Sequence, residues 1–260
     1  NKIKPIILDK NPNCFLSNKE YDFIKCDISK PDECFNAIKD KNIVACFTAQ
    51  SDIGVPSQGL INSKFELIGV KSEIASIASN KFLFRELMAT HKISQPKYFK
   101  CFSKLDVIKS IKELGYPSVI KSVDSSGSRG ISIIKSIKHI DSAIKYALEN
   151  SREKYFLCEE YIEGIEYGAQ TISTDGNINY LFMHTDWTEK NVPVGHCMPV
   201  NLSKDLIEDF NDLIFSAIKA MNLTGPSNVD LIIDKNNKIF VLEIGARIGA
   251  TCLPELVELS

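Results

Sequence analysis

The order of strand and helix patterns changes near residue 80, and this change limits the folds open to the chain. Before it, strand and helix patterns alternate, in the order strand Pro5–Leu8, strand Phe23–Cys26, helix Pro31–Lys39 and strand Ile43–Thr48. Such alternation is typical of parallel βαβ units. Further along, strands follow one another across short turns at residues 175–176 and 234–237, which indicates antiparallel hairpins. The sequence therefore predicts an α/β part followed by an α+β part.

Composition excludes several classes of partner. Lys and Arg number 31 against 33 Asp and Glu, for a net charge of −2, so a nucleic-acid-binding protein built on positive charge is excluded. Apolar runs are broken by charged residues well before the ~18 residues that a membrane helix needs. The eight cysteines form no C-x-x-C pair, and we expect them to be reduced, as in a cytoplasmic protein. The four histidines are scattered, and we expect no transition-metal site from them.

A lysine followed by a loop of small residues is the first chemical signal. Lys121 ends an apolar strand, and residues 122–130, which read SVDSSGSRG, lead into the next strand. Small residues let backbone N–H groups approach phosphate oxygens, while Lys121 and Arg129 supply positive charge. The alternative is an ordinary hairpin loop with an exposed lysine. It is not the GxxxxGK[ST] phosphate loop, because the lysine precedes the loop and a strand follows it.

Acidic residues crowd a strand–hinge–strand segment at residues 158–167, CEEYIEGIEY. A carboxylate can accept from an adenine amino group, backbone groups can bind the ring edge, and a second carboxylate can bind ribose hydroxyls. The alternative is a solvated acidic turn.

A predicted hairpin carries two carboxylates on neighbouring strands. Asp230 and Glu243 interrupt apolar runs, and the connection between them lets them face each other on one side of the sheet. Two buried carboxylates are costly unless a cation such as Mg²⁺ offsets their charge. Arg247 follows, placed to bind phosphate or a developing negative charge. The alternative is a carboxylate pair bound to Arg247 without a metal.

Taken in order, these segments resemble the ATP-grasp superfamily across roughly residues 80–260. The matching positions are Asn80-Lys81, Lys121, Glu159-Glu160-Tyr161-Ile162, Glu166, Asp230 and Glu243. The first ~75 residues are similar to the Rossmann-like domain that precedes the grasp, without its first glycine-containing strand and loop. The segment Gly195–Pro199, GHCMP, resembles the carbamoyl-phosphate-synthase-like and amino-acid ligase branch.

The resemblance implies ATP as the nucleotide, and it assigns the residues that would bind it. Lys81 and Lys121 would hold the phosphates, and Ser126, Gly127 and Ser128 would cover them. Glu159 would accept from the adenine amino group, and the backbone of Glu160 and Ile162 would bind the ring edge. Glu166 would bind the ribose.

The resemblance also implies a metal site and catalytic residues. Asp230 and Glu243 would bind Mg²⁺, with Mn²⁺ as an alternative, and Arg247 would act with Lys121 in catalysis by stabilising an acyl phosphate. Many members carry Asn two residues after the second carboxylate, where this chain has Gly245. That ligand is therefore lost, or replaced by water or by Asn228.

We expect two domains, a Rossmann-like one at residues 1–78 and an ATP-grasp domain at residues 79–260 with a mobile lid around residues 100–160. We expect the first to be incomplete at its N-terminus and the second at its C-terminus, where residues 254–260 have a helical pattern.

The resemblance implies an ATP-dependent ligase that joins a small carboxylate, such as an amino acid, to an amine through an acyl phosphate. One alternative is an enzyme like phosphoribosylamine–glycine ligase, or one that forms carboxyphosphate. Another is a non-catalytic nucleotide-binding module. A dehydrogenase is disfavoured because no G-x-G-x-x-G is present. His196 is open between a substrate contact and a structural loop residue. Family precedent also suggests a homodimer.

Overall fold

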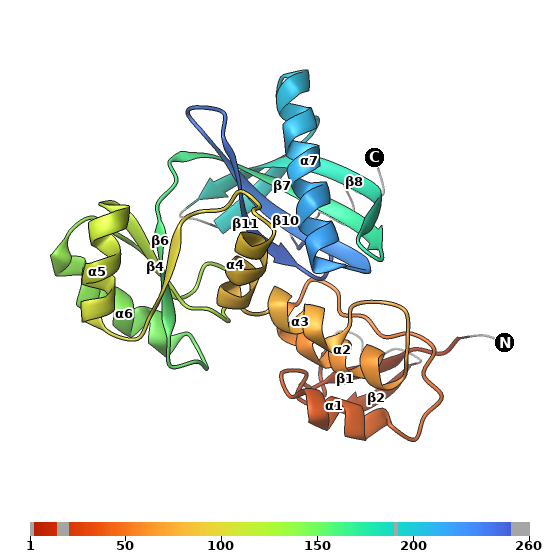
Figure 1. Cartoon of the computed structure of the whole chain (residues 1–260). Coiled ribbons are helices and arrows are strands. Elements are labelled where there is room, and N and C mark those ends of the chain that lie inside the picture. The colour runs from red at the N-terminus through yellow and green to blue at the C-terminus, as the bar shows by residue number, and fades with distance from the viewer. Residues whose placement is uncertain (1–2, 15–20, 190–191, 251–260) are drawn as a thin grey trace.

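The computed structural model describes residues 3–14, 21–189 and 192–250, and these residues form three sheets (Figure 1). A small parallel sheet lies near the N-terminus, a four-stranded antiparallel sheet follows, and a five-stranded antiparallel sheet completes the described part. The predicted change from parallel to antiparallel pairing is confirmed.

The N-terminal part packs helices against the parallel pair β1–β2. Its elements are β1 (Ile6–Asp9), β2 (Asp22–Lys25), α1 (Pro31–Ile38), the 3-10 turn η1 (Asp52–Gly54) and α2 (Val55–Lys64). Cys26, Cys34, Ile38 and Ile61 form its buried core. The predicted strand Ile43–Thr48 is wrong, because this segment is irregular in the structure. Its apolar side chains include exposed Val44 and Phe47, so they lack the neighbouring strand that an apolar run needs for burial.

The four-stranded sheet carries two helices and forms one lobe, drawn in yellow and green in Figure 1. Its strand order is β3 (Tyr98–Cys101), β6 (Phe156–Glu160), β4 (Ser118–Lys121), β5 (Ile131–Ile134), and its helices are α5 (Lys104–Leu114) and α6 (Ile140–Glu149), the latter preceded by the 3-10 turn η2 (Ile137–His139). The start of α5 follows from local chemistry, since Ser103 and Asp106 form a capping box. Apolar residues of both helices and of the sheet share one core.

The five-stranded sheet forms the second lobe, with the long helix α7 (Lys204–Met221) packed on it. Its strand order is β11 (Ile239–Gly245), β10 (Gly225–Asp234), β7 (Gly164–Thr174), β8 (Asn177–Glu189), β9 (Val192–Cys197). Both predicted hairpins are present. The sequence did not predict β9, nor that β8 extends to Glu189, because polar residues interrupt both segments.

Two helices join these parts. They are α3 (Ser72–Ala78) and α4 (Lys81–Thr90), and Figure 1 shows α4 between the two antiparallel sheets. Asn80 caps α4 by accepting from the N–H groups of Phe82 and Leu83. No helix within the described residues is long and apolar enough to span a membrane. The helical pattern at residues 254–260 lies outside the described residues.

Candidate nucleotide and metal site

One face of the five-stranded sheet collects polar side chains. Asp230 of β10 pairs with Glu243 of β11 and with Gly168 of β7, and Gly168 pairs in turn with His184 of β8. Residues directly opposite one another on paired strands share a face of the sheet. The chain therefore places two carboxylates and a histidine in one row across four strands.

Of the two carboxylates, Glu243 pairs with Lys81, whereas Asp230 forms no ion pair with any described residue. Burial, and then the charge of Glu243, raise the pKa of Asp230 to about 7. Asn228 donates to Asp230 Oδ1 at 2.8 Å, which stabilises the ionised form in part. Oxygen donors with excess negative charge are the donor set that Mg²⁺ takes, so these residues fit the predicted metal.

Lys81 links this pair to the small-residue loop. Its buried side chain lies 3.1 Å from Glu243 Oε1 and donates to the Ser125 carbonyl at 2.7 Å. Its position follows from the Asn80 cap, which fixes the first turn of α4. One side chain, Lys81, therefore pairs with the Glu243 carboxylate and also reaches the small-residue loop.

The loop folds back on itself beside a cavity of about 400 Å³. Ser125 Oγ donates to the Arg129 carbonyl at 2.7 Å, and Arg129 Nε donates to the Ser126 carbonyl at 3.0 Å. Gly127 has a φ of 65°, in the region that favours glycine. Lys81, Ser126, Arg129 and Glu243 all line the cavity. Segments distant in sequence therefore meet around one space large enough for a triphosphate.

A buried ion network joins α4, β4 and β6. The Glu159 carboxylate contacts Arg85 Nε at 2.8 Å and Lys121 Nζ at 2.7 Å, and all three side chains are nearly inaccessible to solvent. Burial alone would raise the pKa of Glu159, but the two cations and their hydrogen bonds lower it to about 2. Burial lowers the pKa of Lys121 to about 8, against the opposing effect of Glu159. Glu159 thus has partners that the sequence did not predict.

Arg85 was not assigned a role from the sequence. It also donates to the carbonyl groups of Val241 and Leu242, so it connects α4, β6 and β11. The available signal was its spacing, four residues after Lys81 on one helix face.

The hinge after β6 leaves backbone groups available. The Glu160 N–H donates to the Lys97 carbonyl at 2.9 Å, whereas no acceptor for the Ile162 N–H is found among the described residues. Glu166 lies exposed at the start of β7, opposite Ile232. Burial by surrounding atoms, and then the charge of Asp186, raise its pKa. Neither Glu159, Glu160, Ile162 nor Glu166 lines the 400 Å³ cavity.

Arg247 has a partner from the N-terminal part. Its guanidinium forms a two-point ion pair with Asp52, in which NH2 donates to Oδ2 at 2.8 Å and Nε lies 2.7 Å from Oδ1. The alternative in which Arg247 directly bridges Asp230 and Glu243 is therefore not what the structure contains. A Cβ at Gly245 would lie 3.2 Å from both Asp52 Oδ1 and Arg247 Cζ, so glycine leaves room for this ion pair.

Asn228 is engaged on both ends of its amide. Its Nδ2 donates to Asp230, and its Oδ1 accepts from Gln170 Nε2 at 2.5 Å. Gln170 in turn accepts from the Gly249 N–H. Its role as a replacement metal ligand stays a prediction.

The expectation that the histidines form no cluster is wrong. His184 and His196 approach one carboxylate, Asp186, from strands β8 and β9. They are twelve residues apart in sequence, and only the pairing of these strands brings them together. Among the described cysteines, Cys26, Cys34, Cys101 and Cys158 are buried and Cys197 is exposed.

Replacing Asp230 by Asn should stabilise the metal-free protein at alkaline pH. Because the folded pKa is raised, the native state holds a proton that the unfolded chain releases near pH 4, and native stability falls as pH rises toward about 7. Asp230→Asn removes this penalty and keeps an oxygen for Asn228. We expect its Tm in EDTA to exceed that of the wild type at pH 8, with the gap closing toward pH 5. Equal melting temperatures at pH 8 would contradict the uncompensated charge.

The fold and site define a class: a two-lobed protein in which Glu243, Lys81 and a loop of small residues line one cavity. The family model for the ATP-grasp domain matches residues 78–251, which is more than half of the chain. The chain belongs to the ATP-grasp family.

Curated relatives agree with this assignment. The chain is 23% identical over 218 residues to the carbamoyl phosphate synthase large chain of Thermotoga petrophila, a match that covers 82% of this chain and 20% of the relative. It is 23% identical over 256 residues to the corresponding protein of Clostridium acetobutylicum, covering 95% and 24%. The chain therefore spans about a fifth to a quarter of these large chains.

Solved structures share the fold. Phosphoribosylglycinamide synthetase from Anaerococcus prevotii superposes with a TM-score of 0.73 at 29% identity, covering 91% of this chain and 60% of that one. Biotin carboxylase from Campylobacter jejuni gives 0.80 at 18% identity, covering 98% and 62%. L-amino acid ligase from Bacillus licheniformis gives 0.71 at 19% identity, covering 87% and 54%.

Proposed function

We propose that this protein is an ATP-dependent carboxylate–amine ligase that works through an acyl phosphate. The observation that carries the proposal is the meeting of Glu243, Lys81 and the small-residue loop around one cavity, with Asp230 directly opposite Glu243. Membership of the ATP-grasp family supports it. A carboxylate together with the cations Lys81 and Arg129 around one cavity suits a metal-bound triphosphate.

The nucleotide lies across both lobes in this proposal. Lys81 and Lys121 bind phosphate oxygens, and the loop Ser126, Gly127 and Ser128 closes over them. The adenine edge binds to the backbone of Glu160 and Ile162, which is consistent with the unpaired Ile162 N–H. The Glu159 carboxylate is committed to Arg85 and Lys121, so we assign it to holding Lys121 in place. Glu166 binds the ribose.

The chemistry needs no protein nucleophile. An oxygen of the substrate carboxylate attacks the γ-phosphorus of ATP, the bond to the bridging oxygen breaks, and ADP leaves with an acyl phosphate formed. The amine then attacks the acyl carbon, loses a proton and expels phosphate. Mg²⁺ bound by Asp230 and Glu243 would neutralise phosphate charge. Lys121 and Arg247 stabilise negative charge, and the ion pair with Asp52 fixes the Arg247 guanidinium in orientation.

The two domains follow the same proposal. Residues 1–78 form the Rossmann-like domain that precedes the grasp, and residues 100–160 form a lid that closes on the nucleotide. The Asp52–Arg247 ion pair supports a contribution of the first domain to the site.

Two other activities can be distinguished from this ligase activity by a single assay of ADP release. The 29% identity to phosphoribosylglycinamide synthetase favours phosphoribosylamine and glycine as one substrate pair. The relatives named for carbamoyl phosphate synthase favour bicarbonate as the phosphate acceptor. ADP release measured with paired amino acids, with phosphoribosylamine plus glycine and with bicarbonate plus ammonia distinguishes them. Nucleotide binding without turnover on any pair would indicate a non-catalytic module.

Replacing Lys121 by Met should weaken ATP binding and spare the fold. Methionine fills the buried path of the lysine stem, and Glu159 keeps its contact with Arg85. Loss of one buried cation at phosphate should raise the Kd for ATP by about tenfold or more. Calorimetry provides the measurement, and exposed Lys135→Met in the same lobe is the control. An unchanged Kd in Lys121→Met would remove Lys121 from the nucleotide site.

A further inference from the structure

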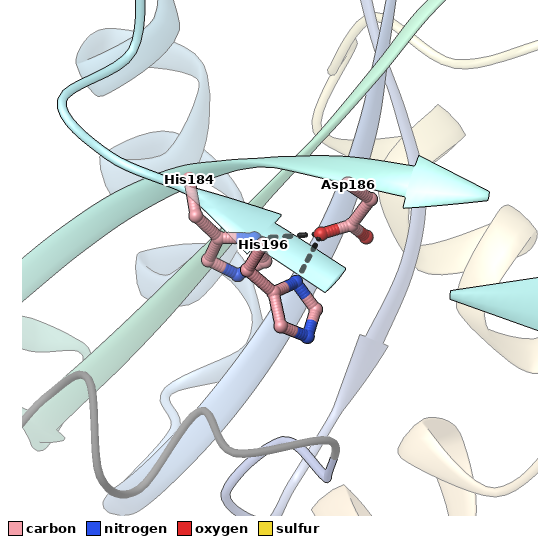
Figure 2. Close-up of side chains that lie close together, drawn as sticks. All are labelled: His184, Asp186 and His196. Atoms are coloured by element: carbon pink, nitrogen blue, oxygen red, sulfur yellow. Dashed lines mark hydrogen bonds and ion pairs between the residues drawn. The ribbon is translucent and has the colours of Figure 1, made fainter. Parts of the chain in front are cut away.

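Two histidines and one aspartate form a compact cluster on the polar sheet face. His184 Nδ1 and His196 Nδ1 each lie 2.7 Å from the same oxygen, Asp186 Oδ1. Figure 2 shows both imidazole rings converging on this carboxylate from β8 and β9. The ring centroids are 4.7 Å apart, with planes at 77°. The ligand atoms that the three side chains offer lie within 4.8 Å of one another.

The hydrogen bonds of this cluster fix the tautomers. A single ionised carboxylate oxygen can only accept, so each Nδ1 carries a proton, and in the neutral form of such a ring the lone pair is on Nε2. A carboxylate that holds the far nitrogen of an imidazole is the arrangement found behind metal-ligating histidines.

One of these lone pairs has no donor. His184 is 1% exposed, and its Nε2 has no hydrogen-bond partner among the described residues. Leaving a buried acceptor unpaired is unfavourable, so such an atom indicates a missing partner. A metal ion supplies that partner, since neutral imidazole nitrogen is a common metal ligand.

The sheet is shaped to hold His184 in this place. A Cβ at Gly168 would lie 2.1 Å from His184 Cε1 and 2.6 Å from its Nε2. Only glycine on β7 therefore lets the ring lie across the neighbouring strand. Gly168 pairs with Asp230, which puts His184 two strands, or roughly 10 Å, from the carboxylate pair.

We propose that His184, His196 and Asp186 form a second metal site, which takes a transition-metal ion of the Zn²⁺ class. The two imidazoles ligate the ion, and Asp186 orients both rings. Zn²⁺ accepts nitrogen and oxygen donors at 2.0–2.2 Å, whereas Mg²⁺ prefers oxygen alone. The carboxylate oxygens of Asp230 and Glu243 therefore suit Mg²⁺, and the imidazole nitrogens suit Zn²⁺, at two separate sites on one sheet face.

This site lies on the same sheet face as the carboxylate pair, two strands from Asp230. An ion held by two protein ligands keeps positions for water or for a substrate group. If the proposed ligase activity is correct, that group is the carboxylate or the amine of the acceptor substrate. The binding of the metal does not depend on that activity, so the two can fail separately.

The test is calorimetric titration of Zn²⁺ into chelator-treated protein, without nucleotide and with excess Mg²⁺ to occupy Asp230 and Glu243. We expect one ion per chain. His184→Asn should weaken binding at least 100-fold, and Asp186→Asn should weaken it by about 10–100-fold. The control variant His91→Asn changes an exposed histidine and should bind like the wild type.

Two further variants keep the result interpretable. Cys197→Ser, next to His196, tests whether the exposed thiol binds the ion instead, and unchanged affinity supports the histidine site. Gly168→Ala keeps all three side chains but displaces the His184 ring, and should also weaken binding. Far-ultraviolet circular dichroism checks the fold of each variant. No stoichiometric Zn²⁺ in the wild type, or binding that survives in folded His184→Asn, would overturn the proposal.

Discussion

Glu243→Gln should lower ATP turnover by at least about 100-fold while leaving the protein folded. Gln keeps the shape of the side chain and loses the charge that faces Asp230 and lies 3.1 Å from Lys81. Asp230 alone then cannot balance the charge of a divalent ion, so we expect the bound nucleotide to lose its metal. ADP release at saturating Mg²⁺, with the substrate pair identified by screening, measures the effect.

A matched control separates this effect from a general loss of charge. Glu208 lies exposed on α7, in the same lobe, and Glu208→Gln should turn over like the wild type. Wild-type turnover in Glu243→Gln would remove Glu243 from the metal site. It would leave the proposed function without its central observation.

Arg85→Met should lower the free energy of unfolding by about 3–5 kcal/mol. The guanidinium is fully buried and contacts Glu159, and it donates to the carbonyl groups of Val241 and Leu242. Removing the guanidinium leaves Lys121 as the one cation of the network that contacts Glu159. The carbonyl groups of Val241 and Leu242 lose their hydrogen bonds from Arg85. Urea denaturation followed by circular dichroism gives the free energy directly.

The comparison is with an arginine at the surface. Arg152 pairs with Asp124 at 3.1 Å, but its side chain is 67% exposed. An exposed ion pair contributes about 0–1 kcal/mol, so Arg152→Met should cost no more than that. Equal destabilisation by the two substitutions would contradict a structural role for the buried network.

Helices and hairpins that depend on neighbouring residues were predictable. The capping box at Ser103 begins α5, and the turn at residues 175–176 joins β7 to β8. Strand Ile43–Thr48 failed because an apolar run becomes a strand only when another strand pairs with it. Strand β9 was missed for the opposite reason, since pairing with β8 overrides its polar and proline-containing sequence.

The residues of the candidate site also fall into those that the sequence could predict and those that it could not. Lys121, Asp230 and Glu243 could be selected from the sequence because each interrupts or ends an apolar strand, and a polar residue there requires a reason. Arg85 and Asp52 could not, because their local sequence, including the spacing of Arg85 from Lys81, is equally typical of a solvated charge. Their partners, Glu159 and Arg247, are 74 and 195 residues away in sequence.

The sequence by itself determined the change near residue 80 from alternating strands and helices to antiparallel hairpins, and it marked the charged residues that interrupt apolar segments. Tertiary structure alone decided which of those charges meet: Glu159 with two cations, Arg247 with Asp52, and two histidines on Asp186. The physical reason is that periodicity and capping act over a few residues. Charge pairing depends instead on strand register and on how the lobes pack, which no short segment specifies.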